Sequence, residues 1–124
     1  MPKISKDSAE AQDFGAVEVH EHELGEYTVN LLSFRETQDM APMFTGLPDG
    51  MCQCPHWGYV LEGRQVWRFA DHEEVFEAGD AFYVGPGHVP VFEAGTEMIQ
   101  FSPTEEMKAT DEAIQKYMEA TQGS

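Results

Sequence analysis

The chain has 124 residues, of which 41% are hydrophobic, so its length and composition fit one globular domain with a real core. Twenty-three acidic residues against seven lysines and arginines give a net charge of −16, which repels phosphate backbones and anionic lipids. We therefore expect neither nucleic acid nor a membrane as a partner. The lack of an apolar signal or membrane-spanning segment predicts a cytoplasmic protein.

Residues 1–13 are polar and without periodicity, and are interpreted as a flexible arm. From Phe14 onward, Gly, Pro or Asp recurs about every eight to twelve residues between segments rich in Val, Tyr, Phe and Trp, which is typical of an all-β barrel or sandwich. A hairpin turn is expected at Glu62–Gly63. The predicted strands are 16–22, 26–34, 54–63, 64–70, 73–78, 80–86, 89–94 and 97–102.

Two other segments interrupt or follow the strands. Residues 37–50 contain too much Pro and Gly for a strand, so we expect a long loop of the kind that often covers a site. A helix is predicted after the barrel domain (14–103), with Ser102 as N-cap, Pro103 at the first helical position, and a helix and tail over 104–124. Its apolar face, expected to pack against the barrel or a second subunit, comprises Met107, Ile114, Tyr117 and Met118.

The segment "MCQCPHWGYVLEG" places Cys52, Cys54 and His56 at alternate positions, and therefore on one face of a strand. Thiolate and imidazole are donors that Zn²⁺ prefers, and imidazole also suits iron, nickel and copper. The two cysteine Cα atoms would be about 6.6 Å apart, so a disulfide would be strained and reduced thiols are expected. The competing interpretation is two small buried thiols and a hydrogen-bonded core histidine.

Residues 73–95, "EEVFEAGDAFYVGPGHVPVFEAG", resemble the second cupin motif, in which a Gly-Asp corner leads through a strand to a Pro-x-Gly turn and a histidine. "CPHWGYVLEGRQVWRF" resembles the end of the first cupin motif, and "GLPDGMCQCPHWGYVLEG" is similar to a group of small bacterial cupins without an established function. The resemblance implies an all-β, RmlC-like double-stranded β-helix (jelly-roll) barrel with a short C-terminal helix. It also implies a homodimer and one metal inside the barrel.

The ligand positions depart from the usual cupin pattern of His-x-His, a later Glu, and a His in the second motif. With Gly63 taken as the hairpin glycine, the first motif His falls on Gly50, the second on Cys52 and the Glu on His56. The histidine of the second motif falls on Pro90, but His88 lies two residues earlier and so on the same face.

An alternative alignment makes His56 the first motif histidine, with Gly58 replacing the second and Glu62 as the acid. We disfavour it, because it puts the acidic ligand into the hairpin turn at the end of the barrel. The resemblance thus adds His88 to the candidate ligands Cys52, Cys54 and His56.

The number of ligands depends on Pro55. In a straight strand Cys52 and His56 would be about 13 Å apart at Cα, too far to share one ion. Pro55 removes a ladder hydrogen bond and can mark a bulge that lets Cys52, Cys54 and His56 converge with His88. A regular strand through this segment would leave only Cys54, His56 and His88.

Two functions follow from these alternatives. Three protein ligands leave an open coordination position, which predicts a metal-dependent oxygenase, isomerase or lyase acting on a small molecule inside the barrel, with Tyr83 as a catalytic proton carrier. Four ligands form a closed Cys₂His₂ site and predict a non-catalytic binding or sensing module. Zinc is the first choice of divalent metal, with iron, nickel or copper as alternatives. Trp57 and Tyr59, opposite His56, are expected to pack between sheets or at a dimer contact.

Overall fold

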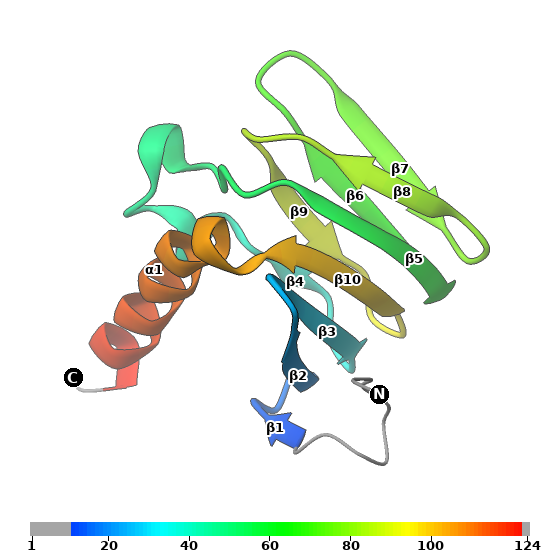
Figure 1. Ribbon diagram of the computed structural model, residues 1–124, viewed down its shortest axis with the longest axis horizontal. Coiled ribbons are helices and arrows are strands. Elements are labelled where there is room, and N and C mark those ends of the chain that lie inside the picture. Colours follow the sequence, from blue (N-terminus) through cyan, green and yellow to red (C-terminus); the bar gives the residue numbers. More distant parts are fainter. Residues whose placement is uncertain (1–10, 123–124) are drawn as a thin grey trace.

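The computed structural model describes residues 11–122, which form two antiparallel sheets and one long helix (Figure 1). The strands are β1 Ala11–Asp13, β2 Val17–Leu24, β3 Tyr27–Phe34, β4 Gln38–Asp39, β5 His56–Glu62, β6 Arg64–Arg68, β7 Glu73–Glu77, β8 Ala81–Val84, β9 Val89–Phe92 and β10 Glu97–Pro103. The helices are η1 Ala41–Phe44 and η2 Pro48–Gly50, both 3₁₀, and α1 Thr104–Gln122. The larger sheet has the order β1-β2-β3-β10-β5-β8 and the smaller sheet has the order β4-β9-β6-β7.

Each of the eight predicted segments contains a strand, and the all-β prediction is confirmed. Strand β5 begins at His56 rather than at residue 54, because Pro55 has no N–H to donate to a ladder. Ala11–Asp13, the last part of the expected arm, pairs with β2 as an edge strand, and residues 1–10 lie outside the described residues. Within 11–122, no helix has both the length and the apolarity needed to cross a bilayer.

The main core lies between the two sheets. Side chains alternate along each strand, so Met98, Gln100 and Ser102 of β10 face inward while Phe101 faces solvent. Gly58 has no space for a side chain, since a Cβ there would lie 2.5 Å from the Phe82 ring. The buried apolar residues of this core are Phe34, Val60, Trp67, Phe82, Val84, Phe92 and Met98.

A second apolar cluster lies at one end of the barrel, where α1 and η1 pack against each other. The predicted loop 37–50 contributes β4, η1 and η2 to this end, so it is folded against the barrel. Met107 and Ile114 of α1 pack into the cluster, as the predicted apolar helix face requires. Its buried members are Phe44, Leu47, Cys52, Cys54, Val89 and Met107.

The start of α1 differs from the prediction. Ser102, the expected N-cap, belongs to β10, where its backbone pairs with Thr28 of β3. The helix begins at Thr104, whose hydroxyl bonds that of Thr28 at 2.9 Å. Ser102 therefore does not cap the helix, because the strand ladder continues through Pro103 and because the Ser102 side chain bonds a histidine of β5, described below.

Candidate metal centre

Three of the four candidate ligands converge at the end of the barrel beneath α1. The ligand atoms of Cys52, His56 and His88 all lie within 4.8 Å of one another, and all three residues are buried. His56 opens β5, whereas Cys52 and His88 face each other across an isolated bridge. The backbone N–H of Cys52 donates to His88 O at 2.9 Å, and that of His88 donates to Cys52 O at 3.2 Å.

The irregular backbone before β5 makes this convergence possible. Residues 53–55 are not part of a strand, so Cys52 and His56 approach each other far more closely than in an extended segment. Cys52 Sγ lies 3.7 Å from His56 Nε2. Cys54 does not join them: its Sγ lies 3.3 Å from the carbonyl of Pro55 and 3.9 Å from that of Pro103. The structure therefore assembles three candidate ligands, and Cys54 packs as a buried free thiol.

His88 presents an unused nitrogen to the cluster. Its Nδ1 donates to the carbonyl of Gly85 at 2.6 Å, because a carbonyl oxygen can only accept. Burial lowers the pKa of His88 to about 4, so at neutral pH the ring carries only this one proton. Its Nε2 is then unprotonated and carries a free lone pair, and this nitrogen has no hydrogen-bond partner within residues 11–122. A fully buried, unpaired acceptor is costly unless something binds it.

His56 is held in a matching orientation. Its Nδ1 lies 2.7 Å from the hydroxyl of Ser102, leaving Nε2 directed toward Cys52. Burial, with a smaller contribution from His88, lowers the pKa of His56 to about 3, so this ring is also neutral. A hydrogen bond to the second ring nitrogen fixes the ring orientation of a metal-binding histidine.

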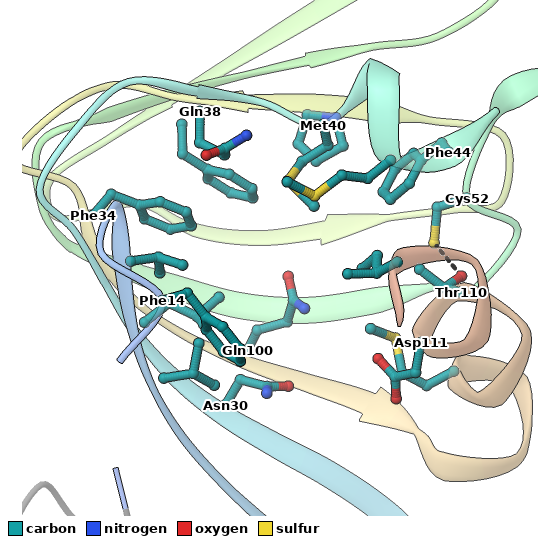
Figure 2. A pocket seen from close by; sticks show the side chains of 18 of the residues that line it. Phe14, Asn30, Phe34, Gln38, Met40, Phe44, Cys52, Gln100, Thr110 and Asp111 are labelled. Atoms are coloured by element: carbon teal, nitrogen blue, oxygen red, sulfur yellow. Dashed lines mark hydrogen bonds between the residues drawn. The ribbon is translucent and has the colours of Figure 1, made fainter. Parts of the chain in front are cut away.

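Cys52 is anchored by the helix. Its Sγ lies 3.1 Å from the hydroxyl of Thr110 on α1 (Figure 2). Burial raises the pKa of the Cys52 thiol, an effect that the contact with Thr110 partly opposes. At neutral pH the sulfur is therefore a protonated thiol that would release its proton on binding a metal. One thiolate and two imidazoles form a donor set that suits zinc and other late transition metals.

The cluster opens onto a cavity of about 740 Å³ between the sheets and α1. In Figure 2, Cys52 and Thr110 lie at one end of this cavity and Phe14 and Phe34 lie at the other. Met40 and Phe44, which belong to the segment predicted as a long loop, line this cavity. The walls are largely apolar, with a few polar side chains from the larger sheet and from α1.

Tyr83 does not contribute to the site, and the expectation that it points inward is wrong. It is 53% exposed on the outer face of the larger sheet, with its ring 5.0 Å from that of Trp57. Phe82 and Val84 are the inward residues of β8, so the strand parity was assigned one residue out of phase. The alternative ligand Glu62 is exposed at the hairpin, and Gly58 has no room for a histidine.

Several polar residues of the site carried no recognisable sequence signal. Ser102 and Thr110 lie 46 and 58 residues from the ligands that they contact. Asn30 and Gln100 are buried polar residues in strands, each with an unpaired side-chain oxygen. The sequence offered a clue for Gln100 alone. Side chains alternate along the predicted strand 97–102, and this alternation places the polar side chain of Gln100 on the inward face.

Solved structures share this architecture. No protein-family model matches the sequence, and no curated protein matches it. An RmlC-like cupin from Shewanella frigidimarina superposes with a TM-score of 0.56 at 21% identity, over 81% of this chain and 88% of that chain. The chain has the cupin fold. The predicted jelly-roll barrel is thereby confirmed.

Two further solved structures superpose on the chain. KdgF from Halomonas sp. superposes with a TM-score of 0.53 at 14% identity, over 80% of this cupin chain and 92% of that chain. The Fe(II) form of HppE gives a TM-score of 0.58 at 11% identity, over 82% of this chain and 60% of that chain. At these identities the likeness establishes the fold alone.

Proposed function

We propose that this cupin-fold protein is a metal-dependent enzyme that acts on a small molecule held in the barrel cavity. The observation that carries the proposal is the buried, unpaired Nε2 of His88, which faces Cys52 and His56. Neutral histidines with fixed tautomers and a nearby thiol are the state in which these residues accept a metal. A structural neighbour with the same fold, HppE, is described as an Fe(II) form.

Three protein ligands favour a reactive centre over a closed one. A transition metal bound by Cys52, His56 and His88 would supply a Lewis acid with an open coordination position. The Ser102 hydroxyl pairs with His56 Nδ1, and the carbonyl of Gly85 accepts the Nδ1 proton of His88. The apolar walls limit the access of water to a substrate in the cavity. Isomerase, lyase and oxygenase chemistry all fit such a site.

We propose zinc as the metal, because one thiolate and two imidazoles are among its preferred donors. Metal content should be measured by elemental analysis on protein purified without added metal. Stoichiometric zinc is expected; iron, nickel or copper would correct the metal but retain the site. Absence of all four, together with no uptake of added Zn²⁺ or Co²⁺, would refute the proposal.

The two cysteines provide a matched pair of variants. Cys52→Ser should weaken Co²⁺ binding on the order of a hundredfold. Four ligands of a structural zinc site together contribute about 10–16 kcal/mol to binding, so one ligand accounts for about a quarter of that, and each 1.4 kcal/mol corresponds to a tenfold change in affinity. Cys54→Ser should leave the affinity unchanged, because Cys54 lies outside the cluster. An equal loss of Co²⁺ affinity in both variants would instead support the alternative, a closed Cys₂His₂ site in a non-catalytic binding protein.

The open position can be tested by spectroscopy. Azide added to the Co²⁺ protein should shift its visible absorption bands, because an exogenous anion can occupy a free coordination position. An unchanged spectrum at saturating azide would indicate a closed site, and with it the non-catalytic alternative.

We also propose a homodimer that forms through the outer face of the larger sheet. Exposed aromatic side chains gather on this face, and the Trp57 ring lies 6.1 Å from Tyr27 and 5.0 Å from Tyr83. Exposed apolar patches of this kind favour protein contacts. This outer aromatic face comprises Tyr27, Trp57, Tyr59, Tyr83 and Phe101.

A further inference from the structure

A row of polar side chains crosses the inner face of the larger sheet, beside the metal centre. Glu21 of β2 pairs directly with Asn30 of β3, and Asn30 pairs with Gln100 of β10. All three line the cavity. The next position in the row is Gly58 of β5, so the row ends where the Phe82 ring occupies the space.

This row offers hydrogen-bond acceptors that have no donor. The amide N–H₂ of Asn30 donates to a carboxylate oxygen of Glu21 at 2.7 Å, which fixes the orientation of the amide and turns Oδ1 away from Glu21. Asn30 is 5% exposed and Gln100 is 6% exposed. Asn30 Oδ1 and Gln100 Oε1 both lack a partner within residues 11–122. Two unpaired buried acceptors that line one cavity offer hydrogen-bonding positions to a donor, whether on a ligand or on an ordered water.

A second carboxylate faces this row from the helix. Asp111 of α1 lines the same cavity, and Figure 2 shows its carboxylate on the opposite side from Asn30 and Gln100. Burial, and then the negative charge of Glu21, raise the pKa of Asp111 to about 6, so the two carboxylates interact across the cavity. Glu21 and Asp111 are both exposed to solvent, which places the two carboxylates at the mouth of the cavity and not in its interior.

In the metal-free protein no lysine or arginine balances these carboxylates among the cavity-lining residues of the described chain. The third lining carboxylate, Glu119, has the same sign. The sheet side of the cavity therefore attracts cations and repels carboxylates and phosphates.

We propose that Glu21, Asn30, Gln100 and Asp111 form a substrate subsite that binds a positively charged, hydrogen-bond-donating nitrogen, as in a primary amine with an apolar body. This subsite depends on the proposed function, because it assumes that the substrate binds in the barrel cavity. An ammonium group supplies donors to the two amide oxygens and a charge to the two carboxylates. The apolar part of the amine would lie against Phe34 and Phe92, which line the same cavity.

The test uses metal-free protein, so that an amine cannot bind through a metal. Three ammonium probes of increasing size (butylammonium, hexylammonium and 2-phenylethylammonium) are compared by titration calorimetry with carboxylates of the same shape (valerate, heptanoate and 3-phenylpropionate). A near-physiological salt concentration limits attraction by the net surface charge. At least one ammonium probe should bind about tenfold or more tightly than its carboxylate partner.

Variants assign the binding to the subsite. Asp111→Asn should remove about tenfold of the affinity for the preferred ammonium probe, because it removes one charge without changing the shape of the side chain. Gln100→Met should weaken binding similarly, and it should not unfold the protein, because it removes an unpaired buried oxygen. Glu112→Gln is the matched control: it removes the same charge one residue along α1, outside the cavity lining, and should have no effect.

The proposal is overturned if the carboxylates bind as tightly as the ammonium probes, if no ammonium probe binds, or if both Asp111→Asn and Gln100→Met bind like the unaltered protein. These results are separable from those on the metal. Selective ammonium binding by a protein that takes up no metal would retain the subsite and refute the metal-dependent function. Metal uptake without ammonium selectivity would do the reverse.

Discussion

Removing the hydroxyl of Ser102 tests how the barrel prepares His56 as a ligand. Ser102 is fully buried, and its Oγ lies 2.7 Å from His56 Nδ1. The Ser102→Ala variant keeps the backbone of β10 but leaves His56 Nδ1 without its hydrogen-bond partner. An unsatisfied buried polar atom costs about 1–3 kcal/mol. We therefore expect the free energy of unfolding of the metal-free protein to fall by that amount.

The same change should weaken metal binding. Loss of an outer hydrogen bond to a metal-binding histidine typically reduces affinity about 10–100-fold, because the ring loses its fixed tautomer and orientation. Competition of the protein with a chromophoric chelator for Zn²⁺ measures this affinity, and urea denaturation measures stability. Long-range ¹H–¹⁵N spectra of the histidine rings should show the proton on Nδ1 of His56 in the unaltered protein.

Ser33→Ala is the matched control, because Ser33 is also a strand serine but has no contact with the cluster. It should change neither quantity appreciably. If Ser102→Ala lowers stability without lowering the affinity for Zn²⁺, the hydroxyl acts only in the fold and His56 is not oriented by it. If His56 carries its proton on Nε2, the assignment of Nε2 as the ligand atom is wrong.

Three further predictions concern packing, pH and assembly. Gly58→Ala should destabilise the fold by about 1–3 kcal/mol in chemical denaturation, because the new Cβ would lie 2.5 Å from a carbonyl oxygen of β10 and from an aromatic ring of β8. The metal-free protein should lose stability as the pH falls below about 6.5, because His56 (pKa about 3) and His88 (pKa about 4) protonate in the unfolded state first. Tyr59→Glu should convert the proposed homodimer into monomers, measured by light scattering after size-exclusion chromatography.

Each of these has a control or a contrary outcome. Gly46→Ala, at a position with open space around the new Cβ, should leave stability nearly unchanged. Protonation of the two histidines in the unfolded state lets the free energy of unfolding fall by up to about 2.7 kcal/mol per pH unit between pH 4 and 6. The raised pKa of Asp111 has the opposite effect, because it increases the free energy of unfolding as the pH falls below about 6. Stability independent of pH between 4 and 6.5 would contradict the buried neutral histidines. A monomeric unaltered protein would refute the dimer.

Local sequence chemistry was sufficient for the eight longer strands of the fold. Strand periodicity and turn residues located them, because β-branched and aromatic segments bounded by Gly and Pro have few other structures available, but they did not reveal the short strands β1 and β4. The cupin barrel was predicted from the resemblance of the Gly63 hairpin and of the Gly-Asp to His88 segment to the two cupin motifs. Pro55 marked the irregular segment, because proline cannot donate to a ladder.

The prediction of which side chains face inward failed for strand β8. Assigning Tyr83 to the interior required knowing which residue of β8 starts the inward series, and a shift by one residue reverses every side chain. Ser102 was predicted as a helix cap from the Pro103 that follows it, although β10 continues to Pro103. The register between strands, which the sequence does not contain, settles both.

Residue identity and short-range spacing in the sequence determined the predicted strands and the candidate ligands Cys52, Cys54 and His56, and the resemblance to the cupin motifs added the barrel and His88. Only the tertiary structure decided that Cys52 joins His56 and His88 while Cys54 turns away, because that outcome depends on the backbone path around Pro55 and on the bridge to a distant strand. The acceptor row of Asn30 and Gln100 was likewise decided by strand pairing across 70 residues of chain, which no local pattern encodes.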